Sequence, residues 1–171
     1  MTKTEDKITF KGSPLSLAGN KVKVGQAAPD FTVLQNDLSP VKLSDYKGRV
    51  CVICSVPSLD TSVCDTEVRK FNEHAATFGD DVVVFAISMD LPFAQKRWCG
   101  AAGIENVQTL SDHLKADFGK SFGVLIEELR LLARAIFIID KDGVIRYIQI
   151  VGEMTNEPDY QNALKAVKEV T

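Results

Sequence analysis

The pattern of apolar and polar positions is clearest in the stretch that leads to Cys64. The run Arg49–Val56 is rich in valine and isoleucine and predicts a buried strand. Pro57 ends this strand, because proline has no N–H to give a central sheet. Apolar side chains then recur at helical spacing. They are Cys64, Val68, Phe71, Ala75 and Phe78. The pattern therefore predicts a strand, a short loop and an amphipathic helix that begins near Cys64.

Three good N-cap residues, Asp60, Thr61 and Ser62, stand just before this helix. They place Cys64 in or near its first turn, where free backbone N–H groups and the positive end of the helix dipole favour a thiolate. Such a thiolate is a sulfur nucleophile. The alternative is a structural cysteine that packs beneath the helix, and position alone leaves both interpretations open.

Turn residues divide the remaining apolar runs into further elements. Strands are predicted at residues 8–10, 15–17, 22–24, 31–34, 41–43, 82–87, 107–110, 134–140 and 144–150. Helical segments are predicted at 44–47, at 112–119 and from Pro158 and Asp159 onward. A further helix is predicted with Asp90 as its cap, Pro92 in its first turn and Gly100 as its stop. Gly12–Pro14 is predicted as a turn, and Lys141–Gly143 as the turn of a hairpin.

Strands alternate with helices through the middle of the chain, and the chain ends in a hairpin and a helix. This order predicts an α/β fold with a mixed central β-sheet flanked by helices. A length of 171 residues suits a single domain over residues 1–171 with a sizeable core. Residues 1–25 are expected to add an N-terminal β-hairpin to that domain.

The charge pattern argues against several classes of partner. The net charge is −3 at pH 7 and no basic run occurs, so neither nucleic acid nor a membrane surface is expected as a partner. Residues 1–11 are polar and contain no apolar core of signal-peptide length, and no segment is long and apolar enough to span a membrane. A cytoplasmic location is therefore expected.

Four cysteines are too few for a disulfide scaffold in a chain of this length. Cys51 and Cys54 have the spacing of a C-x-x-C redox pair, but they lie within the predicted strand 49–56. Residues three apart in a strand face opposite sides and lie roughly 10 Å apart, given a rise of about 3.3 Å per residue. A disulfide requires Cα atoms within about 7 Å. Both cysteines are therefore interpreted as core residues.

A zinc site would need paired ligands at short spacings. Cys64 and Cys99 have no local partner of that kind, and His74 and His113 are isolated, so no metal is expected. The remaining interpretation is that Cys64 and Cys99 are two reactive thiols, each at the end of a helix.

The residues Pro57, Thr61 and Cys64 form a Pro-x-x-x-Thr-x-x-Cys motif that resembles the reactive-cysteine motif of the peroxiredoxins. Three more stretches resemble the bacterial thiol peroxidase subfamily, the atypical two-cysteine peroxiredoxins. They are Ser88–Gln95 with Trp98–Gly100, Leu132–Ala135 and Glu157–Tyr160. The resemblance implies a thioredoxin-like fold, a peroxidase that reduces hydrogen peroxide and organic hydroperoxides, thioredoxin as the reductant, a homodimer, and no cofactor.

The resemblance also implies a role for each residue of the motif. Cys64 would attack the peroxide and become a sulfenic acid. Thr61, one turn earlier, would hydrogen-bond the thiolate or the peroxide oxygen. Pro57 would shield the sulfenic acid from water and from further oxidant.

Arg134 is the candidate for the positive charge that such a reaction needs, because a guanidinium stays charged when partly buried and offers several donors. It lies between Ala133 and Ala135 at the entrance to a very apolar strand, where an unpaired charge would be costly. From the residues alone, an ion pair with a nearby acid explains Arg134 equally well. The resemblance matches it to the active-site arginine of the family.

The resemblance further implies that Cys99 condenses with the sulfenic acid of Cys64 to form an intramolecular disulfide. Two helices hold the thiols apart, so one or both must unwind locally before the sulfur atoms meet. Two alternatives stay open. One is a disulfide oxidoreductase that uses Cys51 and Cys54. The other is a redox-sensing or holdase-like binding module in which Cys64 is oxidised without turnover.

Overall fold

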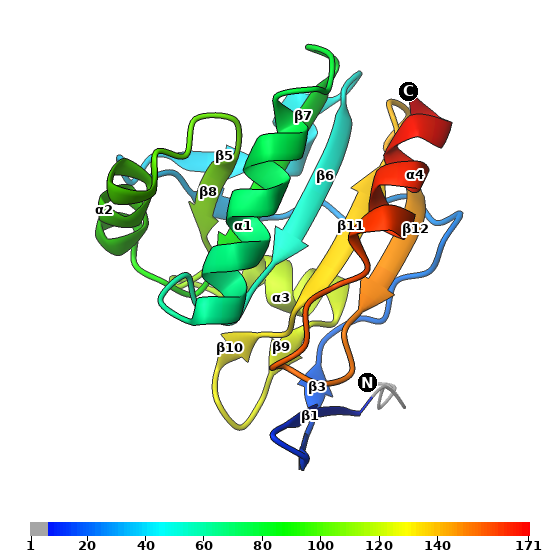
Figure 1. Ribbon diagram of the computed structural model, residues 1–171. Helices are drawn as coiled ribbons and strands as arrows, with labels where there is room; N and C mark the ends of the chain where they lie inside the picture. The colour runs from blue at the N-terminus through cyan, green and yellow to red at the C-terminus, as the bar shows by residue number, and fades with distance from the viewer. Residues whose placement is uncertain (1–6) are drawn as a thin grey trace.

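The computed structural model describes residues 7–171 and centres on a seven-stranded sheet (Figure 1). The strands lie in the order β12-β11-β6-β7-β8-β4-β5. Their bounds are β4 Thr32–Leu34, β5 Pro40–Lys42, β6 Val50–Ser55, β7 Val82–Ser88, β8 Gln108–Ser111, β11 Ala135–Ile139 and β12 Ile145–Ile150. β6, β7 and β8 pair in parallel, whereas the other neighbours are antiparallel. The predicted α/β fold with a mixed sheet is confirmed, as is the hairpin formed by β11 and β12.

Helices cover both faces of the sheet. Their bounds are α1 Ser62–Ala75, α2 Pro92–Ala102, α3 Asp117–Phe122 and α4 Tyr160–Val170, with a 3-10 turn η1 at Leu43–Tyr46. α1 and α4 pack on one face, α3 lies on the other, and α2 lies beside β8 (Figure 1). The predicted cap at the start of α1 is confirmed, because the Thr61 side chain accepts a backbone N–H there, and Asp159 caps α4 in the same way.

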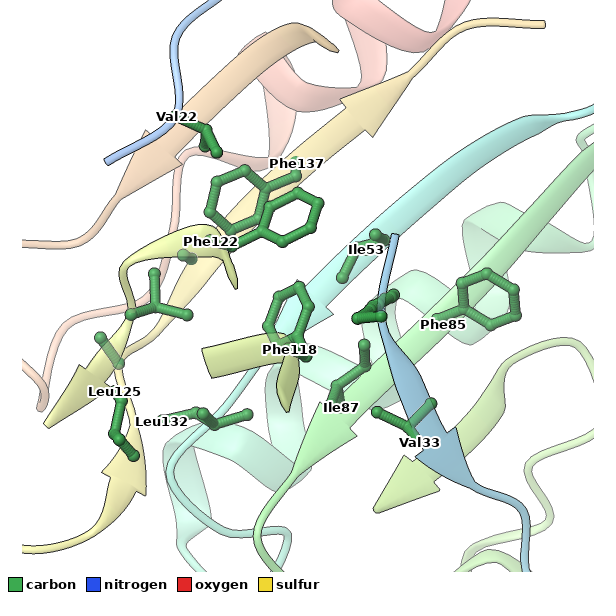
Figure 2. Packing of buried hydrophobic residues seen from close by; sticks show 14 of the residues in the cluster. Val22, Val33, Ile53, Phe85, Ile87, Phe118, Phe122, Leu125, Leu132 and Phe137 are labelled. Atoms are coloured by element: carbon green, nitrogen blue, oxygen red, sulfur yellow. The ribbon is translucent and has the colours of Figure 1, made fainter. Parts of the chain in front are cut away.

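The sheet separates two hydrophobic clusters. On the α3 side, Phe118 stacks on Phe122 with ring centroids 4.9 Å apart, and Phe122 meets Phe137 edge-on at 5.0 Å. Figure 2 shows Ile53 of β6 and Ile87 of β7 projecting toward this cluster. Every residue of β6 is buried, as expected for a central strand that is covered on both faces.

The two cysteines of β6 fall into different clusters. Cys51 belongs to the cluster on the α3 side, and Cys54 belongs to the cluster beneath α1 and α4. Both are buried and unpaired. Strand alternation therefore gives the arrangement that was predicted, with the two side chains on opposite faces of the sheet.

The N-terminal segment differs in detail from the prediction. β1 (Ile8–Phe10) pairs with β2 (Ser13–Leu15), so the turn falls at Lys11 and Gly12 rather than at residues 12–14. Both turn residues have positive φ, as a tight two-residue hairpin turn requires. Residues 1–6 of the predicted 1–25 extension, and of the polar segment 1–11, lie outside the described residues.

The segment after β2 also departs from the prediction. Leu17 does not continue the hairpin. It belongs to a separate strand, β3 (Leu17–Ala18), which pairs with β9 (Leu125–Ile126), and β9 in turn pairs with β10 (Leu131–Leu132). Residues 22–24 form no strand. A distant partner, invisible in the local pattern, decides the pairing here.

The boundaries of α2 were predicted wrongly at both ends. Its N-cap is Leu91, and the helix continues through Gly100 to a left-handed Gly103, whose φ of 67° suits a residue without a Cβ. The side chain of Asp90 instead bonds to the loop before α1. The helix predicted at 112–119 is shifted too, and α3 begins only at Asp117.

Among the described residues, no helix is long and apolar enough to cross a membrane. Within residues 7–171 there is also no group of three or more histidine, cysteine, aspartate or glutamate side chains that could hold a metal ion.

Candidate active site

The loop that joins β6 to α1 fixes the backbone of Cys64. Pro57 is buried at the start of this loop. The Thr61 hydroxyl accepts the backbone N–H of Cys64 at 3.3 Å and donates to the carbonyl of Ser58 at 3.0 Å. Cys64 is thus the third residue of α1, as the capping pattern predicts, and it is 0% exposed. Thr61 holds the backbone of Cys64, while its own proton points at Ser58.

The loop is secured from the end of β7 by Asp90. Its carboxylate accepts the Ser58 hydroxyl at 2.7 Å, the Leu59 backbone N–H at 2.8 Å and the Ser88 hydroxyl at 2.7 Å. The buried amide of Gln95, on α2, also donates to Ser88 at 3.0 Å. One acidic side chain therefore connects the Cys64 loop with the strand end and the helix behind it.

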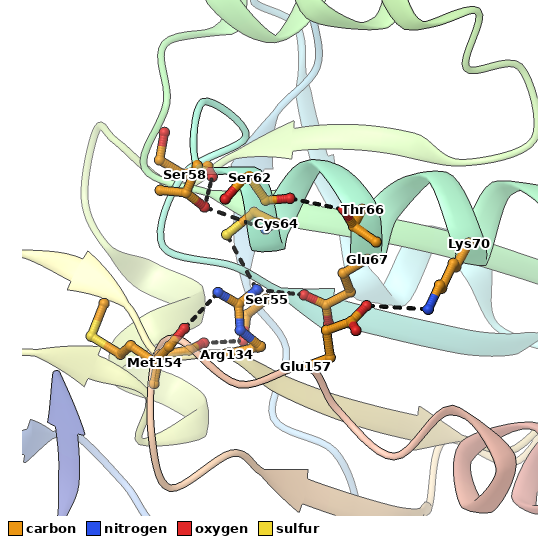
Figure 3. A network of polar contacts seen from close by, with 12 residues as sticks. Ser55, Ser58, Ser62, Cys64, Thr66, Glu67, Lys70, Arg134, Met154 and Glu157 are labelled. Atoms are coloured by element: carbon orange, nitrogen blue, oxygen red, sulfur yellow. Dashed lines mark hydrogen bonds and ion pairs between the residues drawn. The ribbon is translucent and has the colours of Figure 1, made fainter. Parts of the chain in front are cut away.

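Arg134 lies directly before β11 and is only 2% exposed. One guanidinium nitrogen, Nη1, donates to Cys64 Sγ at 3.2 Å and to Glu67 Oε2 at 2.8 Å (Figure 3). The other, Nη2, donates to the Met154 carbonyl at 2.8 Å. The sequence left two interpretations of Arg134 open, an ion pair with an acid and a contact with the reactive cysteine. In the structure the same guanidinium makes both contacts.

Glu67 is the acid of this ion pair, and the sequence reasoning missed it. The side chain is 0% exposed, and its Oε1 atom has no hydrogen-bond partner within the described protein, nor has Arg134 Nε. Burial raises the pKa of Glu67 to about 7, although the charge of Arg134 opposes that rise. A single guanidinium therefore faces two acidic groups in a site closed to solvent.

A second layer surrounds this ion pair. Glu157, near the start of α4, accepts the Lys70 ammonium at 3.2 Å (Figure 3). It also accepts the Tyr160 hydroxyl at 2.9 Å. Its negative charge adds to the rise in the pKa of Glu67. These contacts tie the last helix to the side of α1 that carries the site.

Cys99 lies on a different helix, in the last turn of α2, and is half-buried. Its sulfur is 3.2 Å from the Thr109 hydroxyl, which donates to Asn36 Oδ1 at 3.1 Å. Burial raises the pKa of the Cys99 thiol. A cavity of about 380 Å³ opens beside it, lined among others by Gln35 and Val107. All four cysteines are unpaired, so no bond joins Cys64 to Cys99 here.

Burial also raises the pKa of both cysteines of β6, that of Cys51 to about 11 and that of Cys54 well above its ordinary value. Neither side chain is suited to form a thiolate near neutral pH. Their placement on opposite faces of the sheet also argues against a disulfide between them.

A model of the protein family described as Redoxin matches residues 23–164. This chain belongs to the Redoxin family. Its curated relatives include the thiol peroxidase of Halalkalibacterium halodurans, 60% identical over 94% of this chain and 96% of that protein. The thiol peroxidase of Bacillus subtilis is 56% identical, with the same coverage. Among Redoxin proteins, the chain is a peroxiredoxin-type, thiol-dependent peroxidase, and the resemblance to the bacterial thiol peroxidases is confirmed.

Two solved structures are similar in fold to this chain. The crystal structure of a peroxiredoxin-like protein from Aquifex aeolicus has a TM-score of 0.92, with 45% identity over 99% of this chain and 100% of that one. The thiol peroxidase from Chromobacterium violaceum has a TM-score of 0.87, with 97% of each chain covered. Its sequence identity is 20%, so this similarity supports the fold alone. The expected thioredoxin-like fold is confirmed.

Within this Redoxin chain, Thr61 and Arg134 both contact Cys64, Pro57 lies at the start of the same loop, and Cys99 lies on a neighbouring helix. A signal for Glu67 was present in the sequence. It stands three residues after Cys64, on the side of the helix that carries the apolar stripe. A carboxylate in that position requires a buried cationic partner, and Arg134 supplies it.

Proposed function

We propose that this peroxidase reduces hydrogen peroxide and organic hydroperoxides by oxidising Cys64 to a sulfenic acid. Cys99 then condenses with that acid to form an intramolecular disulfide, and thioredoxin reopens it. The contact that supports this most directly is the 3.2 Å approach of Arg134 Nη1 to Cys64 Sγ in a buried site. A cation against the sulfur stabilises a thiolate and the negative charge that develops on the peroxide oxygens.

The first step breaks the O–O bond. The Cys64 thiolate attacks one peroxide oxygen, the leaving oxygen takes a proton, and the products are a sulfenic acid and an alcohol or water. Arg134 remains charged throughout and offers donors to both oxygens. Glu67 Oε2 holds the guanidinium in place at 2.8 Å. With a pKa of about 7, Glu67 can carry a proton in a site that otherwise excludes water.

Pro57 and Thr61 prepare this step. Pro57 is buried at the start of the loop that leads to Cys64, and we expect its ring to limit access of water and of a second peroxide to the sulfenic acid. Thr61 fixes the Cys64 backbone at 3.3 Å in the resting site. We expect its hydroxyl to turn from the Ser58 carbonyl toward the peroxide oxygen when substrate arrives.

In the second step, the Cys99 thiol attacks the sulfur of the sulfenic acid. An S–S bond forms, the S–O bond breaks, and the hydroxyl leaves as water with the thiol proton. A dithiol reductant is needed to reopen such a bond, and thioredoxin is the proposed one. A homodimer in the cytoplasm is proposed with it, following the resemblance to the atypical two-cysteine peroxiredoxins.

A coupled assay tests the proposal. The protein is supplied with thioredoxin, thioredoxin reductase and NADPH, and NADPH loss is followed with hydrogen peroxide and with a bulky alkyl hydroperoxide. Cys64→Ser should abolish turnover, because an unactivated hydroxyl is a far poorer nucleophile. Cys99→Ser should react once and stop, and it should over-oxidise to sulfinic acid more readily. Cys51→Ala, which removes a thiol away from the site, is the matched control and should keep full turnover.

Peptide mass and gel mobility test the disulfide separately. Oxidised protein should migrate as a monomer on a non-reducing gel and contain a Cys64–Cys99 linkage. Retained turnover in Cys64→Ser would refute the nucleophile. A disulfide-linked dimer as the main product would refute resolution within one chain.

A further inference from the structure

Two residues that adjoin the reactive cysteines are hydrogen-bonded to each other. Asp65 follows Cys64 on α1, and Trp98 precedes Cys99 on α2. Trp98 Nε1 donates to Asp65 Oδ1 at 2.9 Å, which joins the two helices directly. The other carboxylate oxygen of Asp65 accepts Arg69 Nε at 2.9 Å, and the Arg69 guanidinium lies 5.9 Å from the centre of the Trp98 ring.

Other contacts between these segments lie farther along α1. Arg69 Nη1 donates to the Ala102 carbonyl at 3.5 Å. Asn72 Oδ1 accepts the backbone N–H groups of Glu105 at 3.2 Å and Asn106 at 2.8 Å. These bonds use the second and third turns of α1 and survive unwinding of the first. Asp65 lies in the first turn of α1, so its hydrogen bond to Trp98 breaks when that turn unwinds.

We propose that the Asp65–Trp98 hydrogen bond is a latch that couples the segment of Cys64 to the segment of Cys99. While it is formed, both helix ends stay folded and Cys64 keeps its contact with Arg134. When the first turn of α1 unwinds, the latch opens and Trp98, the neighbour of Cys99, loses its hydrogen bond to α1, which leaves Arg69 as the contact of α1 with the end of α2. Asp65 and Trp98 are therefore positioning residues for disulfide formation. This inference rests on the proposed Cys64–Cys99 disulfide.

The chemistry of the latch suits reversible opening. The Asp65 side chain is 35% exposed, so water competes for its oxygens once the bond breaks. Its carboxylate in the first turn also stabilises the folded helix through the helix dipole, and unwinding forfeits that stabilisation. The latch thus favours the folded arrangement without making the unwound one inaccessible.

Cys99 itself is held from β8, through Thr109. The Cys99 sulfur lies 3.2 Å from the Thr109 hydroxyl, which is itself bonded to Asn36 Oδ1 at 3.1 Å. Burial in this position raises the pKa of the Cys99 thiol, so an intact α2 disfavours its thiolate. Unwinding the last turn removes Cys99 from Thr109 and frees it to attack the sulfenic acid, at the moment when the latch has released Trp98.

The two steps can be timed separately by rapid quenching and intact mass. A single addition of peroxide gives the rate of sulfenic acid formation, and the loss of that acid gives the rate of disulfide formation. Trp98→Phe keeps an aromatic ring but removes the N–H donor, and Asp65→Ala removes the acceptor. Each should speed disulfide formation roughly ten-fold, the size expected when one hydrogen bond to a carboxylate is lost. Sulfenic acid formation should stay close to that of the unaltered protein.

The double variant Asp65→Ala, Trp98→Phe should be no faster than Asp65→Ala alone, because that substitution already removes the bond to Trp98. Asp65→Asn, which keeps an acceptor oxygen, should restore a rate near the original. Glu73→Ala removes an exposed carboxylate from the same helix, one that makes no side-chain hydrogen bond or ion pair within residues 7–171, and should change neither step. All variants that form the disulfide faster should also accumulate less sulfinic acid at a fixed peroxide dose.

Unchanged or slower disulfide formation in the folded single variants, or additive effects in the double variant, would overturn the latch. Failure of the underlying proposal looks different. In that case the unaltered protein itself forms no Cys64–Cys99 disulfide, whatever the variants do.

Discussion

The two cysteine segments differ in how each thiol is held. Cys64 is fully buried at the start of α1 and touches a charged guanidinium, whose other contacts fix it from α1 and from the segment before α4. Cys99 is half-buried in the last turn of α2, and its partners, Thr109 and Asn36, are neutral.

This difference matches the two tasks proposed for them. A nucleophile gains from charges that are already oriented before the reaction begins. A resolving thiol gains from a segment that opens at low cost, and helix ends with few buried contacts do so. Charge therefore concentrates around Cys64, and the weaker hydrogen bonds lie around Cys99.

Removing the charge from the Cys64 segment should have the largest effect. Arg134→Met leaves Glu67 buried without its cation, which should cost about 3–5 kcal/mol in the free energy of unfolding. Sulfenic acid formation should slow by roughly a hundred-fold or more. Arg134→Lys keeps the charge but loses the fork geometry. Its stability and its rate of sulfenic acid formation should lie between those of Arg134→Met and the unaltered protein. Urea unfolding and rapid-quench mass measure the two effects.

The matched control is Arg146→Met, which breaks the surface ion pair with Asp140 at 2.6 Å. It should cost less than about 1 kcal/mol and leave the chemistry unchanged. Normal peroxide reactivity in a folded Arg134→Met variant would show that Arg134 serves only the ion pair.

The buried carboxylate gives a second, pH-dependent effect. Glu67 has a pKa of about 7 in the folded protein against an ordinary value of 4.5, because burial penalises its charged form. Because the pKa is raised on folding, protonated Glu67 contributes to the free energy of unfolding. This contribution is complete below pH 4.5 and is lost as the pH rises through about 7. Relative to Glu67→Gln, the unaltered protein should therefore lose on the order of a few kcal/mol over that interval.

Urea unfolding at a series of pH values measures this difference, with Glu73→Gln on the exposed side of α1 as control. A constant difference between the unaltered protein and Glu67→Gln across the whole range would contradict the raised pKa of Glu67.

The smallest effect is expected for the cysteines that lie in neither segment. Cys51→Ala and Cys54→Ala together should leave thioredoxin-coupled turnover intact, because burial keeps both thiols protonated. Each substitution opens a small cavity in the core, at a cost of about 1 kcal/mol. Thermal unfolding and the coupled assay test this pair. Loss of turnover in folded protein would restore these cysteines as candidates for a redox role.

Local chemistry allowed the sequence to predict the elements that carry the site. The β-branched run before Pro57 specifies β6, the hydroxyl of Thr61 caps α1, and strand alternation places Cys51 and Cys54 on opposite faces. These features depend on residues within a few positions of one another. The same reasoning failed at α2, where the helix runs past Gly100 because a single glycine inside a helix costs only about 1 kcal/mol, which packing can offset.

Only the tertiary structure determined which side chains contact one another in the site. Arg134 is 70 residues from Cys64 and 67 from Glu67 in sequence, yet one nitrogen of its guanidinium contacts both. Asp90 looked like a helix cap and instead secures the loop before Cys64, about 30 residues away in the chain. No local preference encodes such partners. A buried charge or hydrogen-bonding group must find a partner, and the packing of β6, β7 and β11 determines which one is within reach.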